Sequence, residues 1–389
     1  MNICFVANTA WSMFNFRRGL LLHLINCGYQ LTIIAPNDDY TKRLEDIGCI
    51  VLDLPMSAKG VNPFEDINLV KLLYRYYRGL KPDFIIHYTI KPNIYGSLAA
   101  KMAGIPSLAI TTGLGYTFVN DNLIAKIARQ LYKMAFRYPK EVWFLNEDDR
   151  QEFLAYSLVS ENKAKLLHGE GVNVSHFSPI SVSSSNNPTT FLLIARMLWD
   201  KGIGEYVEAA RVIKNKYPTT HFKLLGACDV PNPSLISREQ ISMWESEGIV
   251  EYLGTTDDVR TVIAKVDCVV LPSYREGIPR TMLEAAAMAK PLIVSDVPGC
   301  KDVVINGKTG FLCQVKSRDS LAAAMECIIN QSMKERLDMG AAGRAFILEQ
   351  FDERVVINKY IVMLSKYNIR ANCIPSNSVG DSCSDSVIR

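Results

Sequence analysis

Two glutamates, Glu276 and Glu284, stand eight residues apart in a segment that leads from a loop into a helix. The segment follows an apolar strand pattern at 267–271 and contains Gly277 and Pro279. Backbone N–H groups at a helix N-terminus are unpaired and carry the positive end of the helix dipole, so they can hold a phosphate. Carboxylates accept hydrogen bonds from vicinal hydroxyl groups, which suits a ribose at one end and a hexose at the other. The frame Ser-x-x-Glu-Gly-x-Pro after a strand disfavours the alternative, two solvated surface acids.

Two cations, Arg196 and Lys201, stand five residues apart where another apolar strand pattern, at 190–195, gives way to a helical one. A departing nucleoside diphosphate builds up negative charge, which fixed cations and amide dipoles stabilise where no metal does. Arginine grips phosphate through two parallel hydrogen bonds, and lysine acts as a point charge. The alternative interpretation is a salt bridge between Asp200 and one of these cations.

Common nucleotide-loop and metal motifs are missing from the chain. The segment at 113–118 comes nearest to G-x-G-x-x-G but lacks the last glycine, and the Walker-like ending at 307–309 has Asp302 where the leading glycine belongs. No two aspartates are spaced D-x-D, the ten cysteines include no C-x-x-C pair, and the five histidines show no paired ligand spacing. We therefore expect no bound metal and no cofactor.

Strand and helix patterns alternate along almost the whole chain, which is typical of βαβ units and parallel sheets. Hydrophobic residues make up 48% and charged residues 21% of the 389 residues, as in ordinary globular proteins. Strands are expected at 2–7, 30–35, 49–54, 83–88, 107–111 and 141–145, then at 190–195, 221–225, 249–253, 267–271, 291–295 and 309–313.

These elements predict an α/β fold of two facing, Rossmann-like, doubly wound domains. Open α/β sheets bind ligands beyond the carboxyl ends of their strands, so the interdomain cleft is the expected substrate site. The domains are expected at 1–178 and 189–352, joined by a Ser-, Asn- and Pro-rich linker. A last helix is expected at 353–367, and the polar tail at 371–389 is expected to be disordered. No transmembrane run or signal peptide is evident, which favours a cytoplasmic protein.

The layout resembles the retaining glycosyltransferases of family 4, which have the GT-B fold with a C-terminal crossover helix. Their second domain carries R-x4-K and E-x7-E, matched here by Arg196/Lys201 and Glu276/Glu284. Smaller similarities support this resemblance. They lie in the crossover segments 171–173 and 177–179, in the late loops 295–299 and 307–310, and in the final helix. The resemblance covers essentially residues 1–367.

Three fragments, at 91–96, 112–115 and 195–202, are similar to bacterial enzymes that extend undecaprenyl-diphosphate-linked sugars. The nearest resemblance is to N-acetylgalactosaminyl transferases of O-antigen and lipid-linked glycan assembly. It implies metal-independent transfer of a hexosamine from a UDP donor to a polyprenyl-diphosphate-linked saccharide. The sugar that the resemblance favours is N-acetylgalactosamine, transferred in α linkage. It also implies front-face attack, with the leaving diphosphate acting as the base.

The resemblance also implies roles for individual residues. Glu276, Arg196 and Lys201 form the catalytic set, with both cations on the donor diphosphate and Glu284 on the ribose hydroxyls. The other donor-binding residues are Gly277, Ile278, Pro279, Arg280 and Thr281. The first domain takes the acceptor, with Asn15, Lys91, Thr112 and Gly113 as candidates.

Two departures from the family pattern leave the acceptor-activating group open. Many members have a Gly-Gly loop where this chain has 8–12, and many have a histidine in the loop where it has 112–114. His87 lies within a strand pattern, and we interpret it as a core residue.

Basic residues are concentrated in the first half of the chain. The net charge of +3 is too small to indicate nucleic acid. Between residues 59 and 140, however, twelve Lys or Arg stand against four Asp or Glu. Lys126, Arg129, Lys133 and Arg137 form one stripe of an expected helix. Such a stripe would hold the protein peripherally on the anionic inner leaflet of the plasma membrane, unless the cations are simply solvated.

Other functions stay open. One is a soluble GT-B enzyme that acts on a free sugar or sugar phosphate, or an epimerase-like enzyme. Another is a non-catalytic sugar-nucleotide-binding module, which the intact set of two cations and two glutamates disfavours.

Overall fold

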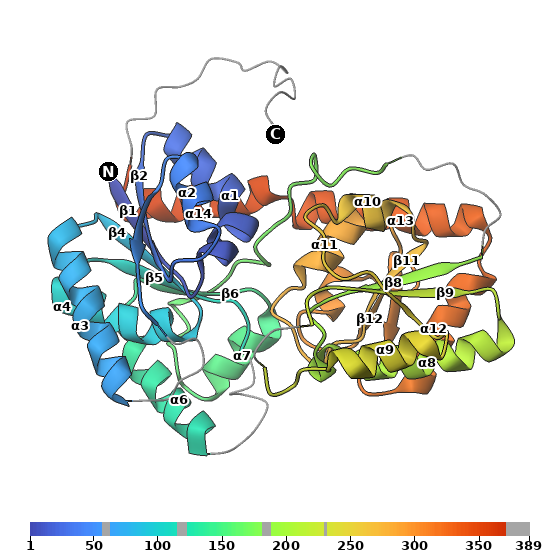
Figure 1. The fold of residues 1–389 in the computed structure, drawn as a ribbon. Coiled ribbons are helices and arrows are strands. Elements are labelled where there is room, and N and C mark those ends of the chain that lie inside the picture. The colour runs from blue at the N-terminus through green and yellow to red at the C-terminus, as the bar shows by residue number, and fades with distance from the viewer. Residues whose placement is uncertain (57–62, 115–122, 181–187, 229–231, 371–389) are drawn as a thin grey trace, which may run out of the picture.

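A computed structural model describes residues 1–56, 63–114, 123–180, 188–228 and 232–370 (Figure 1). It contains a seven-stranded sheet in the order β3-β2-β1-β4-β5-β6-β7 and a six-stranded sheet in the order β10-β9-β8-β11-β12-β13. Neighbouring strands in both sheets run parallel. The predicted pair of doubly wound parallel sheets is thereby confirmed.

The first sheet is built from seven strands: β1 Asn2–Val6, β2 Gln30–Ala35, β3 Ile50–Asp53, β4 Phe84–Tyr88, β5 Ser107–Thr111, β6 Glu141–Phe144 and β7 Ala164–Leu166. Its described helices are α1 Ala10–Asn26, α2 Thr41–Asp46, α3 Pro63–Leu80, α4 Ser97–Ala103, α6 Leu123–Ala135 and α7 Glu147–Ala155, with a π-helix, η1, at Pro92–Gly96. Strand β7 was not predicted, because three residues are too few to show a strand pattern.

The second sheet is built from β8 Thr190–Ile194, β9 His221–Leu225, β10 Glu251–Tyr252, β11 Cys268–Leu271, β12 Leu292–Ser295 and β13 Gly310–Cys313. Its described helices are α8 Ile203–Lys216, α9 Arg238–Ser246, α10 Arg260–Ala264, α11 Arg280–Ala287, α12 Arg318–Asn330 and α13 Met333–Gln350, with short 3-10 turns at Trp199–Lys201 and Lys301–Val303. The last described helix is α14 Glu353–Lys366, and the described residues continue to 370.

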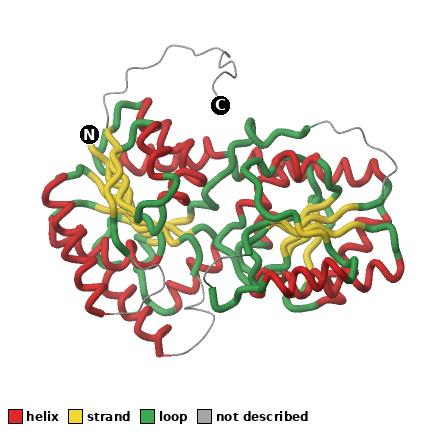
Figure 2. Tube along the Cα trace, viewed as in Figure 1, coloured by secondary structure: helices red, strands yellow, loops and turns green. Residues whose placement is uncertain are grey.

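Helices cover both faces of each sheet, as the red and yellow tube shows (Figure 2). The strands β4, β5 and β6 are buried along their whole length. Strands buried on both faces are nearly continuous apolar runs, which is how they were recognised in the sequence. Each sheet therefore forms the middle layer of a three-layer domain.

Helix α14 crosses back from the second domain and packs on α1 of the first domain. Its Tyr360 and Leu364 are fully buried in one cluster with Leu21 and Leu24 of α1. The predicted tail at 371–389 and most of the predicted linker lie outside the described residues.

Helix α1 begins soon after β1, at a residue that a side-chain cap fixes. Thr9 caps it, because the Thr9 hydroxyl accepts a hydrogen bond from the Ser12 N–H at 3.1 Å. Helix α1 therefore starts at Ala10, directly after the β1 strand, and Asn15 lies in its second turn.

Candidate active site

Lys201 and Glu276 meet as an ion pair at the carboxyl edge of the second sheet. The Lys201 Nζ lies 2.5 Å from the Glu276 Oε1, and the two side chains are 16% and 17% exposed. Lys201 ends the short turn after β8, and Glu276 lies in the loop after β11. These two strands pair directly. Loops that follow adjacent parallel strands lie at the same edge of a sheet, so the two predicted motifs are brought together.

Backbone contacts lock these two loops to each other. The Tyr274 N–H and the Ser273 hydroxyl both donate to the Asp200 carbonyl, at 3.0 and 3.2 Å. Gly202 has φ +71°, and a Cβ there would lie 2.0 Å from the Pro272 carbonyl oxygen. Only glycine permits this approach. Among the described residues, Lys201 pairs with Glu276, and Arg196 makes no ion pair. The alternative interpretation, a salt bridge between Asp200 and one of these cations, is therefore wrong.

Glu284 lies in α11 and is held by the arginine that begins this helix. The Arg280 Nε lies 3.1 Å from the Glu284 Oε1, and the Arg280 guanidinium also donates to the Phe16 carbonyl of α1 at 3.0 Å. Burial raises the pKa of Glu284, and the charge of Arg280 opposes that rise. Arg280 therefore joins the donor helix predicted from sequence to the first domain.

The remaining predicted donor residues differ in their surroundings. Arg196 is exposed, and its side chain makes no ion pair or hydrogen bond with any described residue. Pro279 caps α11 without a side-chain bond, and Thr281 is half-buried in its first turn. Ile278 packs against apolar side chains of both domains, so it helps to hold the domains together.

The loop that carries Glu276 touches the first domain through its glycine. A Cβ on Gly277 would lie 2.4 Å from the Thr112 carbonyl oxygen. The Asn146 side-chain amide donates to the Gly277 carbonyl at 2.7 Å. Gly113, which has φ +125°, lies next to Gly277, because a Cβ on Gly113 would be 3.3 Å from the Gly277 nitrogen. Thr112 and Gly113, predicted on the acceptor side, therefore lie directly against the donor loop.

Three ion pairs join this region to the acidic start of α7. The Arg275 guanidinium lies 2.6 Å from both the Asp149 Oδ1 and the Glu152 Oε2. The Asp149 side chain is only 1% exposed. The Lys301 Nζ lies 3.1 Å from Asp148. Sequence reasoning missed these pairs, although an arginine beside Glu276 and an acidic helix start are both visible in the sequence.

The other acceptor-side candidates are spread over the first domain. The Asn15 amide donates to the Trp11 carbonyl of its own helix at 3.0 Å. Lys91 pairs with Asp66, 3.0 Å from its Oδ1. His87 is fully buried and lies 3.0 Å from the Tyr77 hydroxyl, and burial lowers its pKa to about 3. The histidine is therefore a core residue, as interpreted from its strand pattern.

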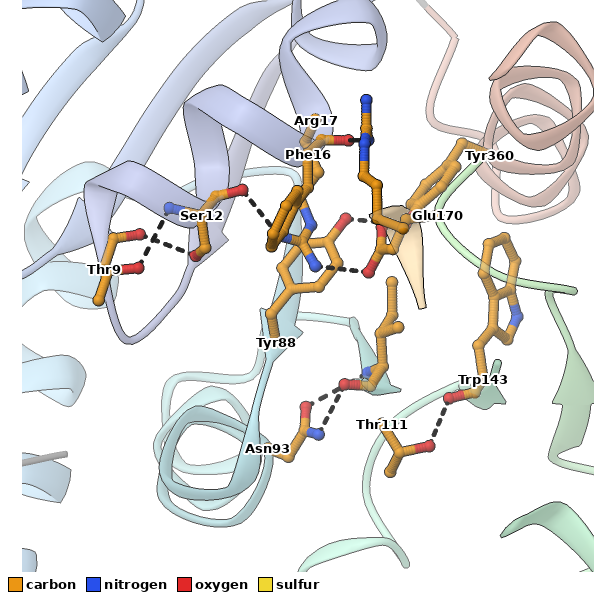
Figure 3. A network of polar contacts seen from close by, with 12 residues as sticks. Thr9, Ser12, Phe16, Arg17, Tyr88, Asn93, Thr111, Trp143, Glu170 and Tyr360 are labelled. Atoms are coloured by element: carbon orange, nitrogen blue, oxygen red, sulfur yellow. Dashed lines mark hydrogen bonds and ion pairs between the residues drawn. The ribbon is translucent and has the colours of Figure 1, made fainter. Parts of the chain in front are cut away.

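A buried polar network fixes the two crossings between the domains (Figure 3). The Arg17 guanidinium of α1 lies 2.5 Å from Glu170, which leads from the first domain toward the second. It also lies 3.8 Å from the centre of the Tyr88 ring. The Tyr88 hydroxyl in turn lies 2.8 Å from that of Tyr360 in α14. The described ranges contain no group of three or more His, Cys, Asp or Glu side chains placed to hold a metal ion.

Comparison with known families and proteins shows which protein family the chain belongs to. The family described as "Glycosyl transferase 4-like" matches residues 2–146, and "Glycosyl transferases group 1" matches residues 178–346. The N,N'-diacetylbacillosaminyl-diphospho-undecaprenol alpha-1,3-N-acetylgalactosaminyltransferase of Campylobacter jejuni is 31% identical over 383 residues, which cover 94% of this chain and 99% of that protein. The chain belongs to glycosyltransferase family 4.

Further relatives of this glycosyltransferase agree in fold and class. The UDP-Gal:alpha-D-GlcNAc-diphosphoundecaprenol alpha-1,3-galactosyltransferase of Escherichia coli is 24% identical over 284 residues, 70% of this chain and 73% of that protein. The crystal structure of Anabaena HepE in complex with UDP and glucose superposes with a TM-score of 0.76 at 18% identity, covering 94% of this chain and 99% of the other. The predicted GT-B fold and glycosyltransferase class are confirmed.

Substitution of Gly277 by alanine tests the contact between the domains of this glycosyltransferase. The added Cβ would collide with the Thr112 carbonyl, so the donor loop or the domain must move. Because misplacement of about 1 Å can lower a rate about 100-fold, we expect glycosyl transfer to fall by about 10- to 100-fold. Steady-state rates measure this. Gly79→Ala is the matched control, because a Cβ there has no atom within 4 Å. Equal rates for both variants would show that the contact does not position the loop.

Proposed function

We propose that this glycosyltransferase moves N-acetylgalactosamine from UDP-N-acetylgalactosamine, with retention of the α configuration, to an undecaprenyl-diphosphate-linked saccharide in bacterial surface polysaccharide synthesis. The observation that carries the proposal is the 31% identity to the C. jejuni enzyme over nearly the whole length of both chains. The E. coli relative, whose name also gives a diphosphoundecaprenol-linked acceptor, supports it.

The ion pair between Lys201 and Glu276 supports a donor site that needs no metal. Before the donor binds, the ammonium and the carboxylate neutralise each other at 2.5 Å. A donor diphosphate would draw Lys201 and the exposed Arg196 to itself, and Glu276 would then accept hydrogen bonds from the hexose hydroxyls. Glu284 would accept from the ribose hydroxyls. In this proposal the two cations stabilise the charge that builds up on the leaving UDP.

A donor panel tests the proposal most directly. The purified chain is incubated with UDP-N-acetylgalactosamine, UDP-N-acetylglucosamine, UDP-galactose, GDP-mannose or a dTDP-sugar, together with a synthetic prenyl-diphosphate-linked N-acetylglucosamine. We expect transfer from UDP-N-acetylgalactosamine, with an α linkage in the product by NMR, and an unchanged rate in excess EDTA. A preference for a GDP- or dTDP-sugar, or a β-linked product, would contradict the proposal.

A soluble acceptor is the second candidate. The sucrose-phosphate synthase of Thermosynechococcus elongatus superposes with a TM-score of 0.79 at 17% identity, so a protein named for a soluble sugar product shares this fold. The same assay separates the two candidates when the acceptor is offered with and without its prenyl chain. Equal use of a free sugar or sugar phosphate would favour the soluble acceptor.

The exposed face of α6 supports attachment to a membrane surface that carries the lipid-linked acceptor. Lys126 and Lys133 of α6 are exposed, as is Arg137, which lies just beyond the end of the helix and so outside the predicted helical stripe. Ile127 and Met134 of α6 are 52% and 41% exposed. Cations beside exposed apolar side chains suit an anionic bilayer surface, where the apolar groups enter the interface. The outward stripe is incomplete, because Arg129 is half-buried with its guanidinium 4.6 Å from the centre of the Tyr156 ring. No helix within the described residues is both long and apolar enough to cross a bilayer.

Vesicle flotation tests this attachment. Each basic residue near an anionic surface contributes about 1 kcal/mol. We therefore expect the triple variant Lys126→Glu, Lys133→Glu, Arg137→Glu to lose binding to phosphatidylglycerol vesicles by about 100-fold or more. The matched control replaces the exposed Lys265, Lys308 and Lys334 of the second domain with glutamate. Equal binding to neutral and anionic vesicles by the unsubstituted chain would refute the attachment.

A further inference from the structure

We propose that a small pocket in the first domain is the subsite for the sugar of the acceptor that receives the transferred residue, an inference that rests on the proposed function. The pocket has a volume of about 230 Å³ and includes Asp66 and Lys91 in its lining. We call it the Asp66–Lys91 pocket. Pockets for drug-sized ligands have volumes of about 300–1,000 Å³, so this smaller one suits a single hexose ring.

The polar wall of the Asp66–Lys91 pocket is fixed in direction by its own contacts. The Lys91 Nζ lies 3.0 Å from the Asp66 Oδ1, and both side chains are 13% exposed. The Tyr95 hydroxyl donates to the other carboxylate oxygen, Oδ2, at 2.6 Å. The Asp66 Oδ1 is buried, so the carboxylate orients the Lys91 ammonium, whose remaining N–H groups can donate to neighbouring sugar hydroxyls.

The charge of the lining favours a neutral sugar over the diphosphate of the acceptor. Among the described lining residues, Glu65 and Asp66 stand against one cation, Lys91, and this excess of negative charge opposes a phosphate. Leu69 and Leu72 form an apolar wall. The C–H face of a pyranose ring can pack on such a wall while its hydroxyls meet the ion pair.

The turn that brings Lys91 into the pocket is strained. Thr89 has φ +70°, and its hydroxyl is buried with no hydrogen-bond partner. A β-branched residue rarely adopts such a φ, and strain of this kind gathers at functional sites. The π-helix η1 follows at once, and π-helical turns are also frequent at such sites. The Asn93 amide holds the turn to β5 through the Ile110 carbonyl and N–H, at 2.8 and 3.2 Å (Figure 3).

The position of the pocket suits an acceptor that must meet the donor. Lys91 follows β4, and Thr112 follows β5, the strand paired with β4. Thr112 is where the first domain touches Gly277 of the donor loop. Pro55 and Met56 of the lining follow β3, so the Asp66–Lys91 pocket lies along the carboxyl edge of the first sheet, the edge at which Thr112 meets the donor loop.

The test fills the pocket without breaking its ion pair. Asn68 is exposed and lines the pocket, so Asn68→Trp places a large ring in the space for the sugar. The probe is a short prenyl-diphosphate-linked N-acetylglucosamine, observed by saturation-transfer NMR with the full chain. We expect saturation of the sugar ring protons to fall at least about tenfold, because the ring displaces a hydrogen-bonded sugar, while UDP affinity stays unchanged.

A second variant and a control complete the test. Asp66→Asn removes the charge of the carboxylate and is expected to raise the KM for the probe about tenfold with little change in kcat, because it removes binding alone. Lys42→Ala, at an exposed surface pair, should behave like the unsubstituted chain. Undiminished sugar saturation in Asn68→Trp would overturn the assignment of the pocket. Lack of transfer from every donor by the unsubstituted chain would overturn the proposed function, while the NMR result would still decide the pocket.

Discussion

Replacement of Lys201 by methionine should lower kcat for transfer by about 10²- to 10³-fold, which is the usual cost of losing one group that stabilises charge in a transition state. Methionine keeps most of the length of the side chain but removes the ammonium that would meet the departing diphosphate. It also leaves Glu276 without its partner at 2.5 Å. Steady-state kinetics with UDP-N-acetylgalactosamine and the prenyl-linked acceptor measure the effect.

Two further variants make this result specific. Lys308→Met removes an exposed lysine of the same domain, and its kcat should match that of the unsubstituted chain. Glu276→Gln should lose activity to a similar extent as Lys201→Met, and the double variant should lose little more, because residues that act as a unit are not additive. Full activity in Lys201→Met would remove this lysine from the catalytic set.

Replacement of Arg275 by methionine should destabilise the protein and slow it as well. Asp149 is 1% exposed and has Arg275 as its ion-pair partner at 2.6 Å. A buried charge that loses its partner costs about 3 kcal/mol or more in the free energy of unfolding. Because Arg275 adjoins Glu276, we also expect the donor loop to lose its position and kcat to fall about tenfold. Denaturant unfolding and transfer rates measure the two effects.

The pH dependence distinguishes an orphaned carboxylate from general damage. Burial raises the pKa of Asp149, and hydrogen bonds from Arg275 oppose the rise. Without Arg275 the pKa of Asp149 in the folded state rises further above its unfolded value. A carboxylate of this kind destabilises the folded state when it is ionised. The loss in the free energy of unfolding is therefore complete above the folded-state pKa, and it shrinks as the pH falls toward the pKa of the unfolded chain, near 4.

The matched control for this pH series is an exposed ion pair. Arg318→Met breaks the pair with Asp319, whose side chains are 51% and 78% exposed, and its stability should stay within about 0.5 kcal/mol of the parent. Arg275→Lys, which keeps the charge, should recover part of the lost stability and rate. A deficit of Arg275→Met that does not change with pH would show that Asp149 is not the group left unpaired.

The donor set could be predicted because its residues lie close to strands that the sequence shows clearly. Lys201 and Glu276 each follow a buried apolar strand, and parallel strands bring such loops to one edge. The pairing of the two side chains needed one further fact, that β8 and β11 are neighbours in the sheet. A doubly wound order makes this adjacency a property of the fold.

The contacts between the domains could not be predicted, because they depend on how two separately folded units meet. Arg275 and Asp149 are 126 residues apart, and no local pattern relates them. The turn at Thr89 was hidden for a different reason. A π-helix differs from an α-helix by one inserted residue, so hydrophobic spacing does not reveal the π-helix at Pro92–Gly96. Strand β7 and the two-residue β10 were too short for their patterns to set their bounds.

The structure of the chain in complex with intact UDP-N-acetylgalactosamine tests the central claim most directly. We expect the diphosphate to lie within hydrogen-bond distance of Lys201 and Arg196, with Glu276 released from Lys201 and facing the hexose, and Glu284 on the ribose. A donor bound away from the carboxyl edge of the second sheet, or one held with Lys201 and Glu276 still paired to each other, would contradict it.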